Sequence, residues 1–374
     1  MTASTFPAAP PPVAEPRTRT LGAVSIHLHA GLLTVRLWGI SWRTSVRAVG
    51  VSLVLAAVVV VGMAWSVSVG DFPIPIGDVV KEISGIGGTT DSDFIIHTLR
   101  LPRVLTGILV GFAFGVSGQI FQRMVRNPLA SPDILGLSSG AALGAVFSIV
   151  ILESGTISAT GAALIGSVCT VIAIYLLAIK QGISSYRLVL VGIGITALLD
   201  AGVEYLLTRA ELNDAHRATV WLTGSLNGRG WEFVRPLTLA LAILVPVAMA
   251  CTRNLRVLEL GDDTASALGV SLRRSKLGLT LSGAGLAAAA TAAAGPVGFV
   301  ALVAPQIARR LVGERAVGIV PAGLVGAAVM VFADLIARRV FSPTELPVGV
   351  ITAVVGAPYL LWLLARANKI GTGG

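Results

Sequence analysis

The charged residues that could do chemistry gather in one polar segment, residues 251–276, with the sequence CTRNLRVLELGDDTASALGVSLRRSK. Apolar runs long enough to cross a bilayer flank it on both sides. Asp262 or Asp263 could cap a first helical turn, and Gly269 is a typical helix stop. Because a simple connection needs only a few residues, we predict a folded surface that a partner protein grips. The alternative is a solvated loop with some local helix.

Two carboxylates, Asp200 and Glu204, lie four residues apart inside an apolar run. This spacing places them on one face of a helix. A charge at the centre of a bilayer costs about 2.5–3.5 kcal/mol, so such residues are expected to face a cavity or a partner. They are the candidate pathway residues. Pairing within the helix bundle, or a position near an interface, is the alternative.

Basic residues mark the ends of two further apolar runs. Arg100 and Arg103 form the sequence RLPR before one run, and Arg338 stands with Arg339 at the end of another. Cationic side chains fixed at helix ends could pair with carboxylates of a docking protein, where charge complementarity sets register and encounter rate. Contact with lipid headgroups is the alternative.

The sequence lacks the motifs of common catalytic and metal sites. It contains no GxxxxGK[ST] phosphate loop, no HExxH, no His/Cys cluster and no serine nucleophile elbow. The four histidines lie outside the apolar runs. We therefore predict a protein without catalytic residues and without a metal site, which does not bind a nucleotide through a phosphate loop of its own.

Composition indicates the elements that position these residues. The chain is 54% hydrophobic and 13% charged, whereas ordinary domains carry about 25% charged residues. Its mean hydropathy is +0.84. The prediction is an all-α, polytopic membrane protein with about ten transmembrane helices. The expected spans are 48–69, 104–122, 135–152, 159–179, 188–207, 233–251, 277–294, 297–312, 317–336 and 348–365.

The distribution of basic residues predicts the orientation. An even number of spans puts both termini on one side of the membrane. If that side is the cytoplasm, 19 of the 28 Lys and Arg residues are cytoplasmic, as the positive-inside rule requires. The net charge of +9 then reports orientation and indicates no nucleic-acid partner. Residues 1–47, which begin Pro/Ala-rich, are predicted to be a disordered cytoplasmic tail, followed by a permease domain over 48–369 with a cytoplasmic loop over 252–276.

Three stretches resemble one protein family. They are RLPRVLTGILVGFAFGVSGQIFQRMVRNPLASPDILGLSSGAALGA at 100–145, LGDDTASALGVSLRRSK at 260–276 running on to AGPVGFVALVAPQIARR at 294–310, and ADLIARRVFSPTELPVGVITAVVGAP at 333–358. They resemble the permease subunits of iron-siderophore and vitamin B12 ABC importers, the type II, ten-helix importers. Within the family, SLNGRGW at 225–231 and GDDTASALGVS at 261–271 are most similar to ferric-enterobactin-type subunits.

The resemblance implies roles for the residues singled out above. The polar segment would hold the coupling helices seated in a groove of a separate ATPase dimer, with the contact made around Leu260, Gly261, Asp262, Asp263, Ala265, Leu268 and Gly269. Arg100, Arg103 and Arg338 match basic positions that pair with an extracytoplasmic siderophore-binding protein. Many relatives have a histidine where this chain has Gln306, so a role that needs an imidazole is in doubt there.

The resemblance also implies partners and a location. The chain would sit in the cytoplasmic (inner) membrane, in contact with lipid, beside a second permease subunit that is a non-identical paralogue. It would bind no cofactor itself, since ATP and Mg²⁺ would be held by the ATPase subunits. The cargo would be a ferric siderophore. Cobalamin or haem is the alternative cargo, and an ion-coupled secondary transporter that uses Asp200 and Glu204 is the alternative mechanism.

Overall fold

The computed structural model describes residues 17–21, 24–29, 32–37, 40–70, 72–83, 93–153, 155–178, 185–313, 318–342 and 344–371. Its strands are β1 (Arg17–Leu21), β2 (Val24–His29), β3 (Leu32–Leu37) and β4 (Ile40–Ser45). Its long helices are α1 (Val46–Ser68), α4 (Leu101–Val125), α5 (Leu137–Val150), α6 (Thr156–Ala178), α7 (Ser185–Arg209), α9 (Trp231–Leu258), α11 (Leu272–Ala294), α12 (Val300–Val312), α13 (Ile319–Arg339) and α14 (Val348–Gly371). Shorter helices are α2 (Ile76–Ile83), η1 (Phe94–Arg100, a π-helix), η2 (Pro132–Leu135, a 3-10 helix), α8 (Leu212–Leu222) and α10 (Asp262–Ala267).

A helix lies at each of the ten predicted spans. Within the described residues, seven helices are long and apolar enough to cross a membrane, and α5 and the first part of α14 are shorter apolar helices. The boundary between the predicted spans 277–294 and 297–312 is confirmed, since α11 ends at Ala294 and α12 begins at Val300. Gly295 has a φ of +78°, a left-handed conformation that glycine adopts without strain. From Val46 onward the described chain consists of helices and loops, as the all-α prediction requires.

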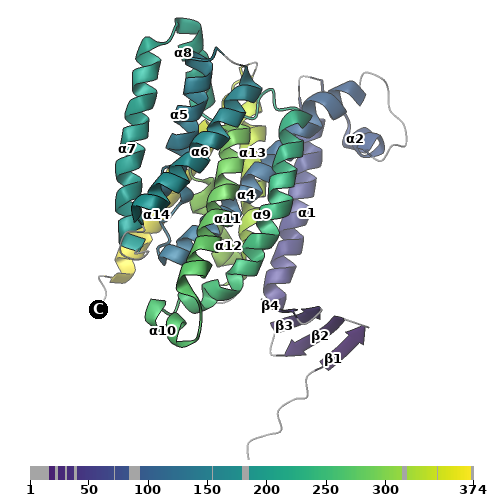
Figure 1. The fold of residues 1–374 in the computed structure, drawn as a ribbon. Coiled ribbons are helices and arrows are strands. Elements are labelled where there is room, and N and C mark those ends of the chain that lie inside the picture. The colour runs from purple at the N-terminus through teal and green to yellow at the C-terminus, as the bar shows by residue number, and fades with distance from the viewer. Residues whose placement is uncertain are drawn as a thin grey trace, which may run out of the picture.

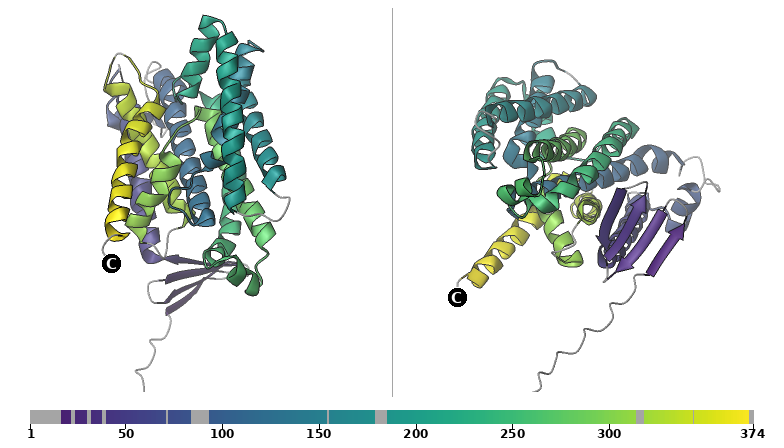
Figure 2. Two further views of the ribbon diagram at one scale, coloured as in Figure 1. Left: turned by 90° about the vertical axis from the view of Figure 1, so that its left-hand side faces the viewer. Right: turned by 60° about the horizontal axis from the view of Figure 1, so that its bottom comes forward.

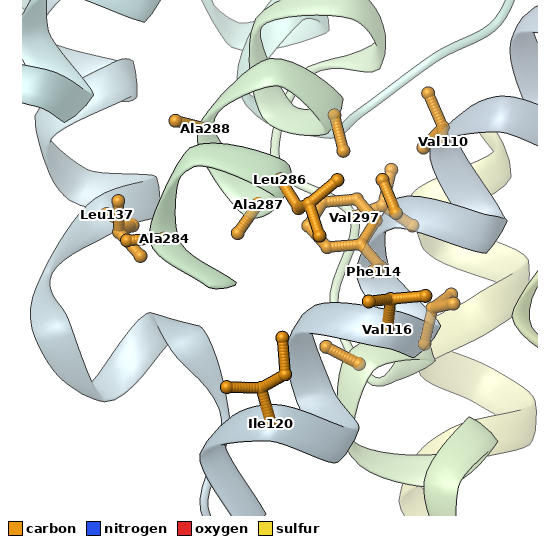
Figure 3. Close-up of a cluster of buried hydrophobic side chains, with 14 of the residues drawn as sticks. Val110, Phe114, Val116, Ile120, Leu137, Ala284, Leu286, Ala287, Ala288 and Val297 are labelled. Carbon is orange, nitrogen blue, oxygen red and sulfur yellow. The ribbon is translucent and has the colours of Figure 1, made fainter. Parts of the chain in front are cut away.

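Helix α4 forms the centre of the bundle and is buried along most of its length. Its side chains Val110, Phe114, Val116 and Ile120 form one buried cluster with residues of α11, namely Ala284, Leu286, Ala287 and Ala288 (Figure 3). On its other side, α4 packs closely against α13. A Cβ at Gly111 would lie 2.3 Å from the carbonyl oxygen of Gly326, and one at Gly115 would lie 2.2 Å from that of Ala322. Gly111 and Gly115 therefore let two backbones approach closely, as small residues do in membrane helix bundles.

Residues 17–45 differ from the predicted disordered tail. The four strands form one antiparallel sheet in the order β1-β2-β3-β4, with Ile26 paired to Val35 and Val35 paired to Trp42. The sequence of β2, VSIHLH, alternates apolar and polar residues, which is the pattern of a strand with one apolar face. The prediction of disorder rested on the Pro/Ala-rich start of the chain, which precedes this alternating segment. Residues 1–16 lie outside the described part, and the division into a tail and a permease domain stays a prediction.

The bundle has two distinct ends. Figures 1 and 2 show α10, the sheet and the C-terminal turns of α14 near one end, and α2 and α8 at the other. The first residue of α1 lies at the α10 end, which agrees with the even number of predicted spans. We call these ends the α10 end and the α8 end.

Candidate functional site

Helix α10 is a short, well-terminated helix at the α10 end of the bundle. It begins after Gly261, whose φ is +107°, and it stops at Gly269, whose φ is +80°. The amide of Gly269 donates to the carbonyl of Ser266 at 2.9 Å, and the amide of Val270 donates to that of Ala265 at 3.0 Å. These two bonds form a Schellman motif, so the predicted stop at Gly269 is confirmed.

The predicted start of this helix is wrong in detail. The N-cap is Gly261, and no side chain makes a capping hydrogen bond to this helix. Asp262 and Asp263 lie instead in the first turn, where a negative charge interacts favourably with the positive end of the helix dipole. The carboxylates therefore stabilise the helix by position and not by capping.

The structure brings the seven predicted coupling residues together and divides them into two groups. Ala265 has no exposed surface and joins α10 to the hydrophobic core of the bundle. Leu260 and Leu268 are 65% and 63% exposed at the two ends of the helix, and Asp263 is exposed beside them. Two exposed leucines on a rigid helix form an apolar contact surface of the kind that a partner covers.

One ion pair joins α10 to α11, and a second joins the segment just before α10 to α4. Lys276 Nζ lies 2.6 Å from Asp262 Oδ2, and the Lys276 side chain is nearly buried. Arg123, in the last turn of α4, donates through Nη2 to Glu259 Oε2 at 2.8 Å and also pairs through Nε with the same carboxylate. Sequence analysis missed the second pair, because 136 residues separate its members. The central helix is thereby joined to the residues just before α10.

Gln306 takes part in a neutral hydrogen-bond network close to the same end. Its Nε2 donates to Gln122 Oε1 at 2.7 Å and to the carbonyl of Pro128 at 2.9 Å. Gln122 in turn donates to the carbonyl of Leu302 at 2.9 Å. An amide can donate and accept at once and carries no charge that depends on pH. The doubt about an imidazole role at this position therefore stands, and the amide has a structural role of its own.

A carboxyl group in the loop between α4 and α5 has an altered pKa. Burial raises the pKa of Asp133 above its ordinary value of 3.8, opposed by hydrogen bonds from Ser138 and Ser131. Ser138 Oγ donates to Asp133 Oδ1, and Ser131 Oγ donates to Oδ2 at 3.4 Å. This residue was not singled out in the sequence, since an isolated Asp after a proline is common in turns.

The three predicted docking arginines meet at the α8 end. Arg100 donates to the carbonyls of Val67 at 2.7 Å and Phe72 at 2.6 Å. Arg103 pairs with Asp334 Oδ1 at 2.9 Å and with Glu345 Oε2 at 2.8 Å, and Arg338 Nε lies 3.1 Å from Asp334 Oδ2. All three guanidinium groups therefore have partners inside this chain. Their pairing with a second protein stays a prediction.

The carboxylates of Asp200 and Glu204 both lie on the exposed side of α7. Among the described residues, no ion pair joins either of them to another side chain. Pairing within this chain's own bundle is thus not what the structure shows. An exposed pair of carboxylates on an apolar helix is suited to a polar path or to a facing subunit.

The chain matches the model of the FecCD transport family over residues 51–366. It is 40% identical over 317 residues to the ferric enterobactin transport system permease protein FepG of Escherichia coli (strain K12), covering 85% of this chain and 96% of that protein. It is 38% identical over 314 residues to the Fe(3+)-citrate import system permease protein YfmE of Bacillus subtilis (strain 168), covering 83% and 93%.

A solved metal-chelate type ABC transporter in an inward-facing conformation has a similar structure, with a TM-score of 0.71 and 28% sequence identity. The match covers 85% of this chain and 99% of that one. The helices described above, the matched family model and these relatives agree with the resemblance found in the sequence motifs. The chain belongs to the FecCD transport family.

Proposed function

We propose that this chain is the membrane-spanning permease subunit of an ABC importer that carries a ferric siderophore across the cytoplasmic membrane. The names of the relatives support iron-chelate transport, since one imports ferric enterobactin and another Fe(3+)-citrate. The observation that carries the proposal is α10, a rigid helix with exposed leucines at both ends. It is the part of the chain best built to receive force from another protein.

The ATPase is the proposed partner at the α10 end. Leu260, Asp263 and Leu268 supply the contact surface, whereas Gly261, Asp262, Ala265 and Gly269 shape and hold the helix. ATP and Mg²⁺ belong to that partner. The proposed orientation puts α10 and both termini in the cytoplasm, since most of the Lys and Arg residues then satisfy the positive-inside rule.

The other proposed partners meet the membrane and outer faces. A siderophore-binding protein docks at the α8 end, around the arginine and glutamate side chains that close the bundle there. A second, non-identical permease subunit faces α7, where it would cover Asp200 and Glu204 and complete the path for the cargo. Such an arrangement removes two carboxylates from lipid, where they would be costly.

Uptake of a ferric siderophore by reconstituted importer tests this function. Leu268→Ala is expected to reduce ATP-driven uptake strongly while leaving the thermal stability within about 0.5 kcal/mol, because the side chain lies on the surface. Leu53→Ala is the matched control, since Leu53 is 67% exposed within α1, outside both the α10 surface and the α8 end. Its uptake is expected to equal that of the unchanged protein.

Two results would contradict the proposal. Normal coupled uptake by a well-expressed Leu260→Ala/Leu268→Ala variant would show that α10 is not the coupling surface. Uptake that needs a membrane potential but no ATP, and that is lost in Asp200→Asn/Glu204→Gln, would establish an ion-coupled transporter. Transport of cobalamin or haem in place of a siderophore would change the cargo and keep the permease role.

A further inference from the structure

A cavity of about 640 Å³ lies at the α8 end, between the loop after α1, the start of α4, the start of α9 and the end of α13. Its charged lining is unusual for the edge of an apolar bundle, because it contains five arginines, namely Arg100, Arg103, Arg229, Arg338 and Arg339. A cavity of this size has room for a polar headgroup and not merely for one water molecule.

The charges around the cavity do not balance. Glu232 and Glu345 also line it, and Asp334 lies behind it between Arg103 and Arg338. Among the residues that the structure describes around the cavity, five guanidinium groups thus stand against three carboxylates. The excess of positive charge favours an anion from outside the chain.

Arg229 is a buried arginine of the lining whose bonding within the chain is incomplete. It is only 6% exposed, and its Nη1 is buried without a hydrogen-bond partner. Its Cζ lies 4.4 Å from the centre of the Phe233 ring, and its Nε is 3.4 Å from the carbonyl of Ser225. Burial lowers the pKa of Arg229 to about 10, so it is still a cation at neutral pH. A buried cation with an unused donor is stabilised by an anion that can accept hydrogen bonds.

The rest of the lining suits the boundary between lipid and water. Phe72 is 72% exposed at the rim, and Leu99 is exposed beside it. Trp231 also lines the cavity, and its indole N–H donates to the carbonyl of His97 at 2.8 Å. The cavity therefore joins the ends of three apolar helices, which begin at Phe94 and Trp231 and end at Arg339. Aromatic rings and arginines at this level are typical of contact with phospholipid headgroups.

We propose that this cavity binds the phosphate group of an anionic phospholipid. Arg229 and Arg339 supply donors to the phosphate oxygens, as guanidinium groups do at other phosphate sites. Phe72 and Leu99 contact the apolar part of the same lipid. The site is separate from the coupling surface, and it does not depend on which solute the importer carries.

Lipid retention by the purified full-length chain tests the proposal. Native mass spectrometry should detect phosphatidylglycerol bound to the unchanged protein in a lipid mixture that also contains phosphatidylcholine. Arg229→Gln and Arg339→Gln should each weaken this binding by about tenfold, the loss expected for one hydrogen bond to a charged group. Arg235→Gln is the matched control, because Arg235 is exposed on the same helix as Trp231 but does not line the cavity.

Because Arg229 is buried, its replacement could impair folding. Arg339 is exposed, so Arg339→Gln tests lipid binding without that effect on folding. Equal lipid retention by Arg339→Gln, Arg235→Gln and the unchanged protein would overturn the proposal. Stabilisation of the protein in pure phosphatidylcholine nanodiscs by inorganic phosphate, with no effect of phosphatidylglycerol, would assign the cavity to free phosphate instead. If the arginine variants lose docking of the binding protein but keep the bound lipid, the cavity is assigned to an acidic side chain of that protein instead.

Discussion

The α8 end and the α10 end of the bundle both contain ion pairs, but they expose different groups. At the α8 end, Asp334 is 2% exposed and lies between two arginines, so its charge is balanced within the chain. At the α10 end, Asp262 and Glu259 keep a substantial part of their side chains in solvent while holding a helix with exposed leucines. The first arrangement fixes the helix ends, and the second supports a surface for a partner.

This difference separates stability from function. Changes at the α8 network should act mainly on folding, because they leave charge buried. Changes at the surface of α10 should act mainly on coupling, because few of its contacts are inside the protein.

Replacing the buried carboxylate should have the largest effect. Asp334→Asn leaves Arg103 and Arg338 facing each other without the charge between them, and is expected to destabilise the protein by about 3–5 kcal/mol. Thermal unfolding in detergent measures this effect. Glu345→Gln is the control, since the Glu345 side chain is 37% exposed and water can replace it. Equal stability of the two variants would show that the buried charge of Asp334 is not what stabilises the α8 end.

The pair between α10 and α11 should respond asymmetrically. Asp262→Asn leaves the nearly buried ammonium of Lys276 without its partner and should cost about 1–3 kcal/mol. Lys276→Met keeps the apolar stem and leaves Asp262 in contact with water, so it should cost less. The same unfolding measurement compares the two variants. A larger loss for Lys276→Met would mean that packing of the lysine stem, and not its charge, secures α10.

The stop of α10 depends on a backbone conformation. Gly269→Ala places a side chain at a φ of +80° and should cost about 1 kcal/mol, although no atom crowds the site. Faster amide hydrogen exchange over residues 262–270 would show the loss locally. Gly50→Ala is the control, because Gly50 is helical and a Cβ there meets nothing within 4 Å. That change should be neutral or stabilising.

The smallest effect is expected at Asp133, as a dependence on pH. Burial raises its pKa above 3.8, so the folded protein binds this proton more tightly than the unfolded chain does. Its contribution is therefore fully present below pH 3.8 and is lost as the pH rises through the raised value. Asp133→Asn should remove this slope and be at least as stable as the unchanged protein at neutral pH. Unfolding curves across the acidic range, with Asp78→Asn as the comparison at an exposed carboxylate on α2, measure it.

The fold was predictable where local patterns determine it. A helix lies at each span that the long apolar runs predicted, and Gly269 marked a helix end that the structure confirms. The strands were missed, because the alternation in VSIHLH is short and follows a Pro/Ala-rich start. The N-cap of α10 was misassigned, because Gly and Asp are both favoured at that position.

The seven candidate coupling residues fall within ten positions, 260–269, so the sequence alone places them together, and their coupling role stays a prediction. The pairing of the charged residues was not predictable. The partners of Arg103 lie 231 and 242 residues away, and only the tertiary structure brings them together. Arg229 gave no signal of its own, since a single arginine in a Gly-rich loop is ordinary until its burial is known.

Helix α4 has a mechanical consequence. Its 25 residues span about 37 Å at 1.5 Å per residue, with Arg103 in the first turn and Arg123 in the last. Backbone contact at Gly111 and Gly115 leaves no slack for sliding against α13. A displacement of α4 at its Arg103 end is therefore expected to move the whole helix. Because Arg123 pairs with Glu259, three residues before α10, that displacement reaches the start of α10.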